Sequence, residues 1–179
     1  VGSVMSLVCA NAVNGEYAVI GVELPTDRGL KIINQLNNGI FPLTAEDPKI
    51  LEYHKNSLDK GNFFATHEEK AFSYADVIII DINLDVIKNN DNKGFLNDFK
   101  VDLQPLKRAV KTIGDNCKND SLILLETTVP PGTCQEIIKP IIFNCLKKRD
   151  LNTDCIKIGH SYERVMPGPN YIDSIQSYY

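Results

Sequence analysis

An acidic side chain and a glycine stand at the separation that a dinucleotide-binding turn requires. Glu23 closes the apolar run AVIGVE, and Gly2 lies 21 residues before it. A carboxylate at the end of a strand can accept hydrogen bonds from both ribose hydroxyls of a dinucleotide, typically about 20 residues after the glycine-rich phosphate turn. Gly2 then takes the place of the last glycine of that turn, and Arg28 can flank the adenine or the ribose. The alternative is that the three residues share no role, and that Gly2 is a lone glycine, Glu23 an exposed glutamate and Arg28 a solvated helix residue.

Polar side chains follow two further apolar runs. Asn83 comes shortly after DVIIID, and Thr127 and Thr128 come directly after SLILLE. The Asn83 amide can contact a cofactor, although asparagine also favours turns. The two hydroxyls precede a Pro-Gly turn into a helix, where they can bind a ligand at the helix N-terminus or serve in ordinary capping.

An acid and an arginine, Glu163 and Arg164, come soon after the last apolar run, CIKIG. Held side by side at a strand end, they can act as a proton acceptor and as an anchor for phosphate or sugar. The alternative is a surface ion pair. The histidines share no spacing and are interpreted as surface or core residues: His54, His67 and His160.

These residues need a scaffold, and the apolar pattern predicts alternating helices and strands. Helical spacing predicts helices at 3–13, 26–36, 48–60, 67–73, 102–117 and 134–148. Runs of β-forming residues predict strands at 18–23, 62–65, 76–81, 121–126 and 155–159. Residues 89–98 and 161–179 are predicted to be irregular.

Local signals sharpen several of these boundaries. Thr66 and Glu69 have the spacing of a capping box at the start of the fourth helix. Gly39 is placed to end the second helix, and Pro140 is expected to kink the last one. The unbroken run DVIIID predicts a strand that is buried on both faces, as in a parallel sheet.

The alternation predicts an α/β fold, a doubly wound parallel sheet with right-handed crossovers. Ligands bind such sheets beyond the carboxyl ends of the strands. Several of the residues above stand at strand ends, so we expect these to face one crevice: Glu23, Asn83, Thr127, Thr128, Glu163 and Arg164. Because the chain opens at Val1 with a helix, we expect the first strand and the rest of the phosphate turn to lie upstream.

Composition excludes several classes of function. The chain has 179 residues, 43% of them hydrophobic, and a formal net charge of −4. The acidic balance argues against nucleic-acid binding, and the apolar runs are too short for a membrane helix. No signal peptide is visible, so the protein is expected in the cytoplasm. The five cysteines have no spacing typical of zinc ligands or of a disulfide framework, and no metal site is expected.

Taken together, the motifs resemble those of the UDP-glucose/GDP-mannose dehydrogenase family. In chain order they are Gly2, VE-x4-R ending at Arg28, NGIFP at 38–42, ADVIII at 75–80, ETTVPPGT at 126–133 and YERVMPG at 162–168. The resemblance covers essentially the whole chain. It implies the Rossmann-like NAD-binding domain of that family over residues 1–179, without the central helix and the UDP-binding domain that follow it.

The resemblance also implies an activity. The family oxidises C6 of a nucleotide sugar, a UDP-hexose or UDP-N-acetylhexosamine, to the uronic acid for polysaccharide biosynthesis, with two NAD⁺ and a cysteine-bound thioester. Its members dimerise or form larger homo-oligomers. NAD is preferred to NADP because the carboxylate of Glu23 repels a 2′-phosphate. A fragment that supplies the cofactor domain alone is expected to be inactive.

The family's site residues carry over one by one. Val1 and Gly2 would belong to the pyrophosphate turn, Glu23 and Arg28 would hold the adenosine ribose, and Asn83 and Thr127 would contact the cofactor. Thr128 would be a catalytic residue that contacts the nicotinamide side or an ordered water. Glu163 would aid hydrolysis of the thioester, and Arg164 and Val165 would contact the substrate.

Three departures from the family pattern remain. Leu84 stands where the family has a hydroxyl, Pro167 stands where the glucose-specific branch often has a glutamate, and no cysteine here matches the family nucleophile. The form ERV-x-PG at 163–168 slightly disfavours UDP-glucose as the substrate. A dehydrogenase of the 6-phosphogluconate or hydroxyacyl type, or a non-catalytic nucleotide-binding remnant, remains an alternative.

Overall fold

The computed structural model describes residues 1–44, 46–84, 86–162 and 164–178, which fall into two compact units. Unit 1 contains Val1–Ala71 together with residues 164–178, and unit 2 contains Phe72–Tyr162. Both units combine helices with parallel strands, so the expected α/β class is confirmed in its coarse form.

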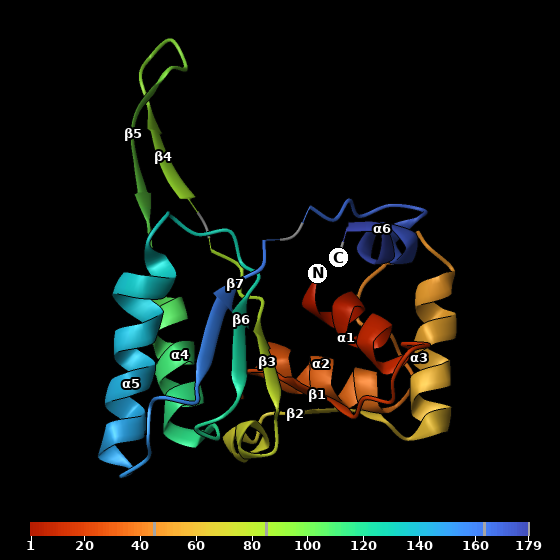
Figure 1. The fold of residues 1–179 in the computed structure, drawn as a ribbon. Helices are drawn as coiled ribbons and strands as arrows, with labels where there is room; N and C mark the ends of the chain where they lie inside the picture. The colour runs from red at the N-terminus through yellow and green to blue at the C-terminus, as the bar shows by residue number, and fades with distance from the viewer. Residues whose placement is uncertain (45, 85, 163, 179) are drawn as a thin grey trace. The chain divides into compact units, whose positions relative to one another are not determined.

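Unit 1 packs helices around a parallel pair of strands (Figure 1). Strand β1 pairs with β2 from Val19 opposite Phe63 to Val22 opposite Thr66. The elements of this unit are α1 (Gly2–Ala10), β1 (Val19–Val22), α2 (Asp27–Asn37), α3 (Lys49–Lys60), β2 (Phe63–Thr66) and α6 (Tyr171–Tyr178).

The core of unit 1 brings together residues that are far apart in the sequence. Leu7 of α1, Ile50 of α3 and Ile172 of α6 are almost completely buried in one apolar cluster. Helix α6 falls within the segment 161–179, which was predicted to be irregular, so that prediction is wrong for this helix. Its Ile172 and Ile175 bury against the rest of unit 1, a tertiary effect that sequence spacing over eight residues does not reveal.

The helix ends of unit 1 follow the local signals. The hydroxyl of Thr26 caps α2 by accepting a hydrogen bond of 3.0 Å from the amide of Gly29. Gly39 and Gly61 follow α2 and α3 with φ of 77° and 68°, the left-handed conformation that glycine adopts at low cost. Thr66 instead accepts from the amide of Glu68, and the predicted fourth helix is a short 3₁₀ segment, η1 (Glu69–Ser73).

Unit 2 is a three-stranded parallel sheet in the order β3-β6-β7, with α4 and α5 side by side against it (Figure 1). Leu106, Ile123 and Ile142 are fully buried between the sheet and the helices. The elements are β3 (Val77–Ile80), α4 (Gln104–Asn116), β6 (Leu122–Leu125), η2 (Cys134–Ile138), α5 (Lys139–Lys148) and β7 (Lys157–His160).

Strand β3 corrects one expectation. Ile78 and Ile80 are buried, whereas Val77 and Ile79 are 50% and 39% exposed, so the strand is not buried on both faces. The buried pair packs in the cluster that α4 and α5 share with the sheet. A run of β-branched residues therefore does not by itself distinguish one covered face from two.

The segment after β3 corrects another expectation. Residues 89–98 were predicted to be a loop, but β4 (Val86–Asn90) and β5 (Leu96–Val101) form an antiparallel hairpin that projects from the rest of unit 2 (Figure 1). The Asp91 carboxylate accepts hydrogen bonds from the amides of Lys93 and Phe95 and closes the turn. The hairpin is almost entirely exposed, so it has no buried face to impose an alternating pattern.

The helix that contains Pro140 is irregular close to the position where a kink was expected. A π-helical turn at Cys134–Ile138 leads directly into α5, which has Pro140 in its first turn. Proline lacks a backbone N–H, and a wider turn is one of the known ways in which a helix adjusts its path. The irregularity therefore lies just before the proline.

Helices α4 and α5 approach closely at Gly114. A Cβ atom added there would lie 2.8 Å from Cβ of Cys145 and 3.3 Å from Cδ1 of Ile142. Gly114→Ala is therefore expected to lower the free energy of unfolding by about 1–2 kcal/mol, because overpacking outweighs the gain in helix propensity. Urea denaturation of unit 2 measures this change. Arg108→Ala, at an exposed position of α4, is the control, and equal stability of the two variants would contradict the prediction.

Candidate functional site

Glu23 lies at the carboxyl end of β1, where the sequence placed it. Its backbone amide donates a 2.9 Å hydrogen bond to the carbonyl of Thr66, which extends the β1–β2 pairing by one step. Its side chain is exposed, and Oε1 accepts a 2.9 Å hydrogen bond from the amide of Leu24. The carboxylate is thus held at the strand end and presented to solvent, an arrangement that fits a ligand with paired hydroxyls.

The other predicted cofactor residues of unit 1 flank β1 in the chain. Gly2 is the first residue of α1, and the Val1 carbonyl accepts the first helical hydrogen bonds, from Val4 and Met5. No side chain among the described residues caps this helix, so its N-terminus keeps the partial positive charge that favours an anion. Arg28 is exposed in the first turn of α2.

In unit 2, Thr127 joins the ends of two neighbouring strands. Its hydroxyl accepts a 2.7 Å hydrogen bond from the amide of Ile82 and lies 3.0 Å from the carbonyl of the same residue. Thr127 is buried, whereas Thr128 and Asn83 are exposed. The structure therefore gives Thr127 a positioning role: it fixes the chain on which Asn83 stands.

Thr127→Val tests this role. The substitution keeps the shape of the side chain but leaves the amide of Ile82 without its acceptor, which is expected to cost about 1–3 kcal/mol of stability. Thermal unfolding measures the loss. Thr127→Ser, which retains the hydroxyl, should recover most of it, and Thr128→Val at the exposed neighbour should have little effect on stability. Equal stability of Thr127→Val and the unchanged protein would refute the assignment.

A hollow of about 370 Å³ lies at the carboxyl end of β7, beside the turn that follows β6. Residues 129–135 and His160 line it. His160 is the last residue of β7, and its ring lies 6.4 Å from that of Tyr162. His160 is exposed, which agrees with its prediction as a surface or core residue. Its place at the end of the last strand is the sequence signal for its position beside the hollow.

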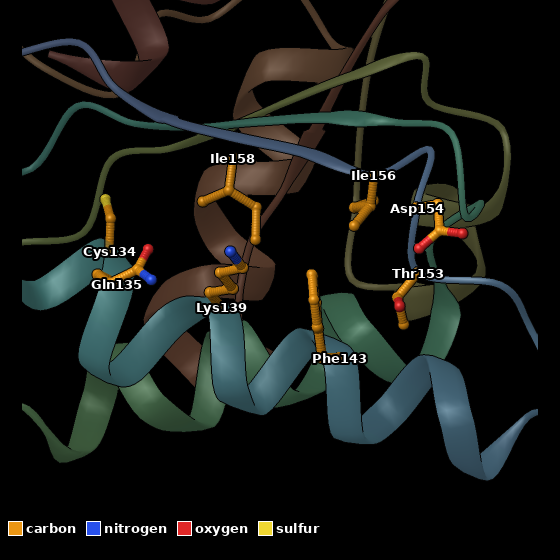
Figure 2. Close-up of a pocket in the computed structure, with 8 residues that line it drawn as sticks. All are labelled: Cys134, Gln135, Lys139, Phe143, Thr153, Asp154, Ile156 and Ile158. Atoms are coloured by element: carbon orange, nitrogen blue, oxygen red, sulfur yellow. The ribbon is translucent and has the colours of Figure 1, made fainter.

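A second hollow, of about 380 Å³, runs along α5 and β7 rather than at the strand ends (Figure 2). Lys139 and Phe143 rise from α5 toward Ile158, and the Lys139 ammonium lies 5.3 Å from the centroid of the Phe143 ring. Asp154 supplies the only carboxylate of its lining. The charged side chains of this lining, Lys139 and Asp154, do not lie at the carboxyl end of a strand.

The predicted acid of the C-terminal segment, Glu163, lies outside the described residues, so its role stays a prediction. Arg164 is exposed, and Val165 is buried in the core of unit 1 beside α1 and α6. The amide of Met166 donates a 3.1 Å hydrogen bond to the hydroxyl of Ser174. Unit 1 therefore holds the chain immediately after Arg164.

The expected single crevice divides between the two units. Unit 1 contains Gly2, Glu23 and Arg28 together with the segment from Arg164. Unit 2 contains Asn83, Thr127 and Thr128, each at the carboxyl end of a strand or just after it. Each unit thus contains part of the predicted cofactor site. That the two parts form one site stays a prediction.

Cys117, Cys134 and Cys145 form no disulfide, and burial disfavours their charged form. Burial raises the pKa of Cys117, Cys134 and Cys145 above the ordinary range, which makes these thiols weak nucleophiles at neutral pH. In the part of the chain that the structure describes, no cluster of three or more histidine, cysteine or acidic side chains could hold a metal ion. In the same part, no helix is both long and apolar enough to span a bilayer.

Curated relatives match most of the chain. UDP-N-acetyl-D-mannosamine dehydrogenase of Methanocaldococcus jannaschii is 32% identical over 153 residues, which are 85% of this chain and 30% of that protein. UDP-glucose 6-dehydrogenase 2 of Arabidopsis thaliana is 24% identical over 143 residues, which are 80% of this chain and 27% of that protein. The chain therefore spans less than a third of the length of these relatives.

Solved structures share the fold. The crystal structure of NDP-N-acetyl-D-galactosaminuronic acid dehydrogenase from Methanosarcina mazei Go1 matches with a TM-score of 0.81 and 25% identity, over 98% of this chain and 34% of that one. The profile of the NAD binding domain of the UDP-glucose/GDP-mannose dehydrogenase family matches residues 1–177. The chain therefore belongs to the UDP-glucose/GDP-mannose dehydrogenase family and corresponds to its NAD-binding domain.

Proposed function

We propose that the full-length protein that carries this chain oxidises C6 of a nucleotide sugar with NAD, and that this chain supplies the cofactor domain. The observation that carries the proposal is the exposed carboxylate of Glu23 at the end of β1, 21 residues after a glycine that opens α1. The family match over residues 1–177 supports it. When bound, NAD supplies the acceptor for hydride.

The residues of unit 1 would bind the adenosine half of the cofactor. Val1 and Gly2 at the start of α1 would receive the pyrophosphate, because helix N-termini favour anions. Glu23 would accept hydrogen bonds from the ribose hydroxyls, and Arg28, in the first turn of α2, would flank the ribose. The carboxylate would also repel the 2′-phosphate of NADP and so select NAD.

The residues of unit 2 and of the segment after it would serve the reacting end. Thr127, tied to Ile82, would hold Asn83 and Thr128 in place toward the nicotinamide. Arg164 would contact the sugar nucleotide, and Val165, whose side chain is buried in the core of unit 1, would contact it through its backbone. Glu163 would take up a proton when water attacks the thioester, since a positioned carboxylate can act as a general base.

The two parallel sheets would be halves of one doubly wound sheet. Among the described residues, β1 pairs only with β2 and β3 pairs only with β6, so each keeps an edge with unpaired backbone groups. In a doubly wound parallel sheet, the carboxyl ends of the strands face one crevice.

The substrate we propose is a UDP-N-acetylhexosamine, the class named for the M. jannaschii relative. The test is formation of NADH by the full-length protein with NAD and, in turn, UDP-N-acetylmannosamine, UDP-N-acetylglucosamine, UDP-N-acetylgalactosamine, UDP-glucose and GDP-mannose. Oxidation of a primary alcohol to a carboxylate removes four electrons, so two NADH should form per sugar consumed. Binding of NAD without oxidation of any sugar would contradict the proposal.

A further inference from the structure

The turn between β1 and α2 is unusually tight. The amide of Leu24 donates to the Glu23 carboxylate, and the carbonyl of Leu24 accepts a 2.8 Å hydrogen bond from the amide of Thr26. The hydroxyl of Thr26 in turn accepts from the amide of Gly29. A short chain of hydrogen bonds thus runs from the first turn of α2 back to the Glu23 side chain.

Gly29 lies where this turn leaves no room for a side chain. A Cβ atom at this position would lie 1.9 Å from the Leu24 carbonyl oxygen and 3.1 Å from Cγ of Glu23. The first distance is far inside van der Waals contact, and the atom that it meets belongs to the backbone. Glu23 itself is fixed to β2 by the hydrogen bond from its amide to Thr66, so the strand end cannot simply move aside.

Glycine is otherwise a poor choice for this position. It costs a helix about 1 kcal/mol relative to alanine, and the buried Gly29 lies within α2 in an ordinary helical conformation. The left-handed conformation that explains Gly39 and Gly61 therefore does not explain Gly29. Close approach of α2 to the end of β1 is the remaining structural reason.

We propose that Gly29 is a positioning residue for the ribose-binding carboxylate: by leaving space for the Leu24 carbonyl, it lets the turn hold Glu23 in its binding orientation. The inference rests on the proposed NAD-binding role of Glu23. A side chain at position 29 would displace the Leu24 peptide, whose N–H orients the Glu23 carboxylate. Affinity for NAD and discrimination against NADP would then fall together, because both depend on the position of that carboxylate.

The test compares Gly29→Ala with Gly21→Ala in the full-length protein. Gly21 lies in β1, where an added Cβ would be 4.0 Å from that of Ala65, an ordinary contact, so this variant controls for adding a methyl group to the same region. Dissociation constants for NAD and NADP are measured by calorimetry, and thermal unfolding is recorded beside them. We expect Gly29→Ala to weaken NAD binding at least about 10-fold, with a smaller effect on NADP, and Gly21→Ala to leave both constants unchanged.

A double variant tells whether Gly29→Ala acts through the position of Glu23 or by destabilising the domain. In a Glu23→Ala background, Gly29→Ala is expected to reduce NAD affinity little further, because the group that it positions is already absent. If Gly29→Ala does not yield folded protein, Thr26→Ala takes its place. That variant removes a capping bond without adding atoms, and we expect it to lower the NAD preference over NADP several-fold.

The outcomes distinguish this inference from the function on which it rests. If the unaltered protein binds no NAD at millimolar concentration, the proposed function itself fails. If it binds NAD, but Gly29→Ala or its substitute Thr26→Ala retains both the affinity and the ratio between the two cofactors, the positioning role is overturned while the function stands. The positioning role would also be overturned if Gly29→Ala lowered the affinities for NAD and NADP equally and lowered NAD affinity by the same factor in the Glu23→Ala background.

Discussion

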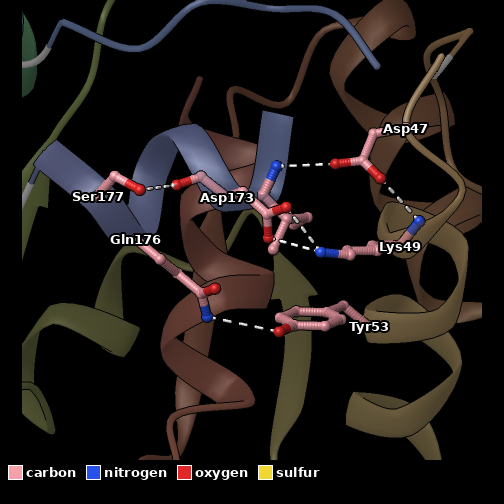
Figure 3. Close-up of polar contacts among 7 residues, drawn as sticks. Asp47, Lys49, Tyr53, Asp173, Gln176 and Ser177 are labelled. Carbon is pink, nitrogen blue, oxygen red and sulfur yellow. Dashed lines mark hydrogen bonds and ion pairs between the residues drawn. The ribbon is translucent and has the colours of Figure 1, made fainter. Parts of the chain in front are cut away.

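Replacing Asp47 with alanine is expected to detach α6 from the rest of unit 1. Asp47 is 1% exposed, and its two carboxylate oxygens accept hydrogen bonds of 2.9 Å each, one from the amide of Lys49 at the start of α3 and the other from the amide of Ile172 at the start of α6 (Figure 3). One buried group thus serves the N-termini of two helices. Its loss should cost about 2–4 kcal/mol, since each cap contributes about 1 kcal/mol and buried amides are left without an acceptor.

Hydrogen exchange of the α6 amides measures this loss of stability. Amides of α6 in the full-length protein should exchange about 30- to 1000-fold faster in Asp47→Ala than in the unaltered protein. Lys49→Met is the matched control: it removes the exposed ion pair between Lys49 and Asp173 but keeps the backbone amide that Asp47 binds, so α6 should stay protected (Figure 3). Unchanged exchange in Asp47→Ala would show that the double cap does not hold α6.

The two hydrogen bonds of Asp47 also help to position the segment that follows Glu163. Val165 packs in the same apolar cluster as Ile172, and Met166 is bonded to Ser174 of α6. Release of α6 would therefore free the chain next to Arg164. In the full-length protein, the proposed contacts to the nucleotide sugar should weaken in Asp47→Ala, while NAD affinity should change less.

Replacing Glu23 with lysine is expected to lower the affinity of the full-length protein for NAD about 10- to 100-fold. The estimate corresponds to the loss of hydrogen bonds between ribose hydroxyls and a charged group, at about 1.5–3 kcal/mol. The new ammonium would attract the 2′-phosphate of NADP, so the ratio of the two affinities should shift toward NADP. Titration with each cofactor measures both effects.

Glu16→Lys provides the control for net charge. Glu16 is exposed and precedes β1, and its replacement changes the charge of unit 1 by the same amount as Glu23→Lys. It should leave both cofactor affinities close to those of the unaltered protein at physiological salt, because distant surface charges are screened. A similar loss in both variants would attribute the effect to overall charge rather than to a ribose contact.

Much of the helical and strand framework is predictable from local pattern. The apolar residues of α4 repeat with helical spacing, and Leu106, Val110 and Ile113 are buried as that spacing requires. The β4–β5 hairpin was missed because its strands are exposed, so neither face is marked by burial. The half-exposed β3 was misread because apolar composition does not tell which face a neighbour covers.

The candidate site was predictable only where its chemistry is local. Glu23 follows its strand directly, and its spacing from Gly2 can be read from the chain. The bond from Ile82 to Thr127 joins residues 45 positions apart, and the bond from Ile172 to Asp47 joins residues 125 positions apart. Neither leaves a periodic signal, because each depends on how distant elements pack. The steric role of Gly29 likewise follows from the path of the turn and not from sequence alone.

The most direct test of the account is a crystal structure of the full-length protein with NAD bound. The account predicts a carboxylate oxygen of Glu23 within hydrogen-bond distance, about 2.6–3.2 Å, of the adenosine ribose hydroxyls. It also predicts the pyrophosphate at the N-terminus of α1, beside Gly2. An adenosine ribose held by other residues, with Glu23 turned away from it, would contradict the account.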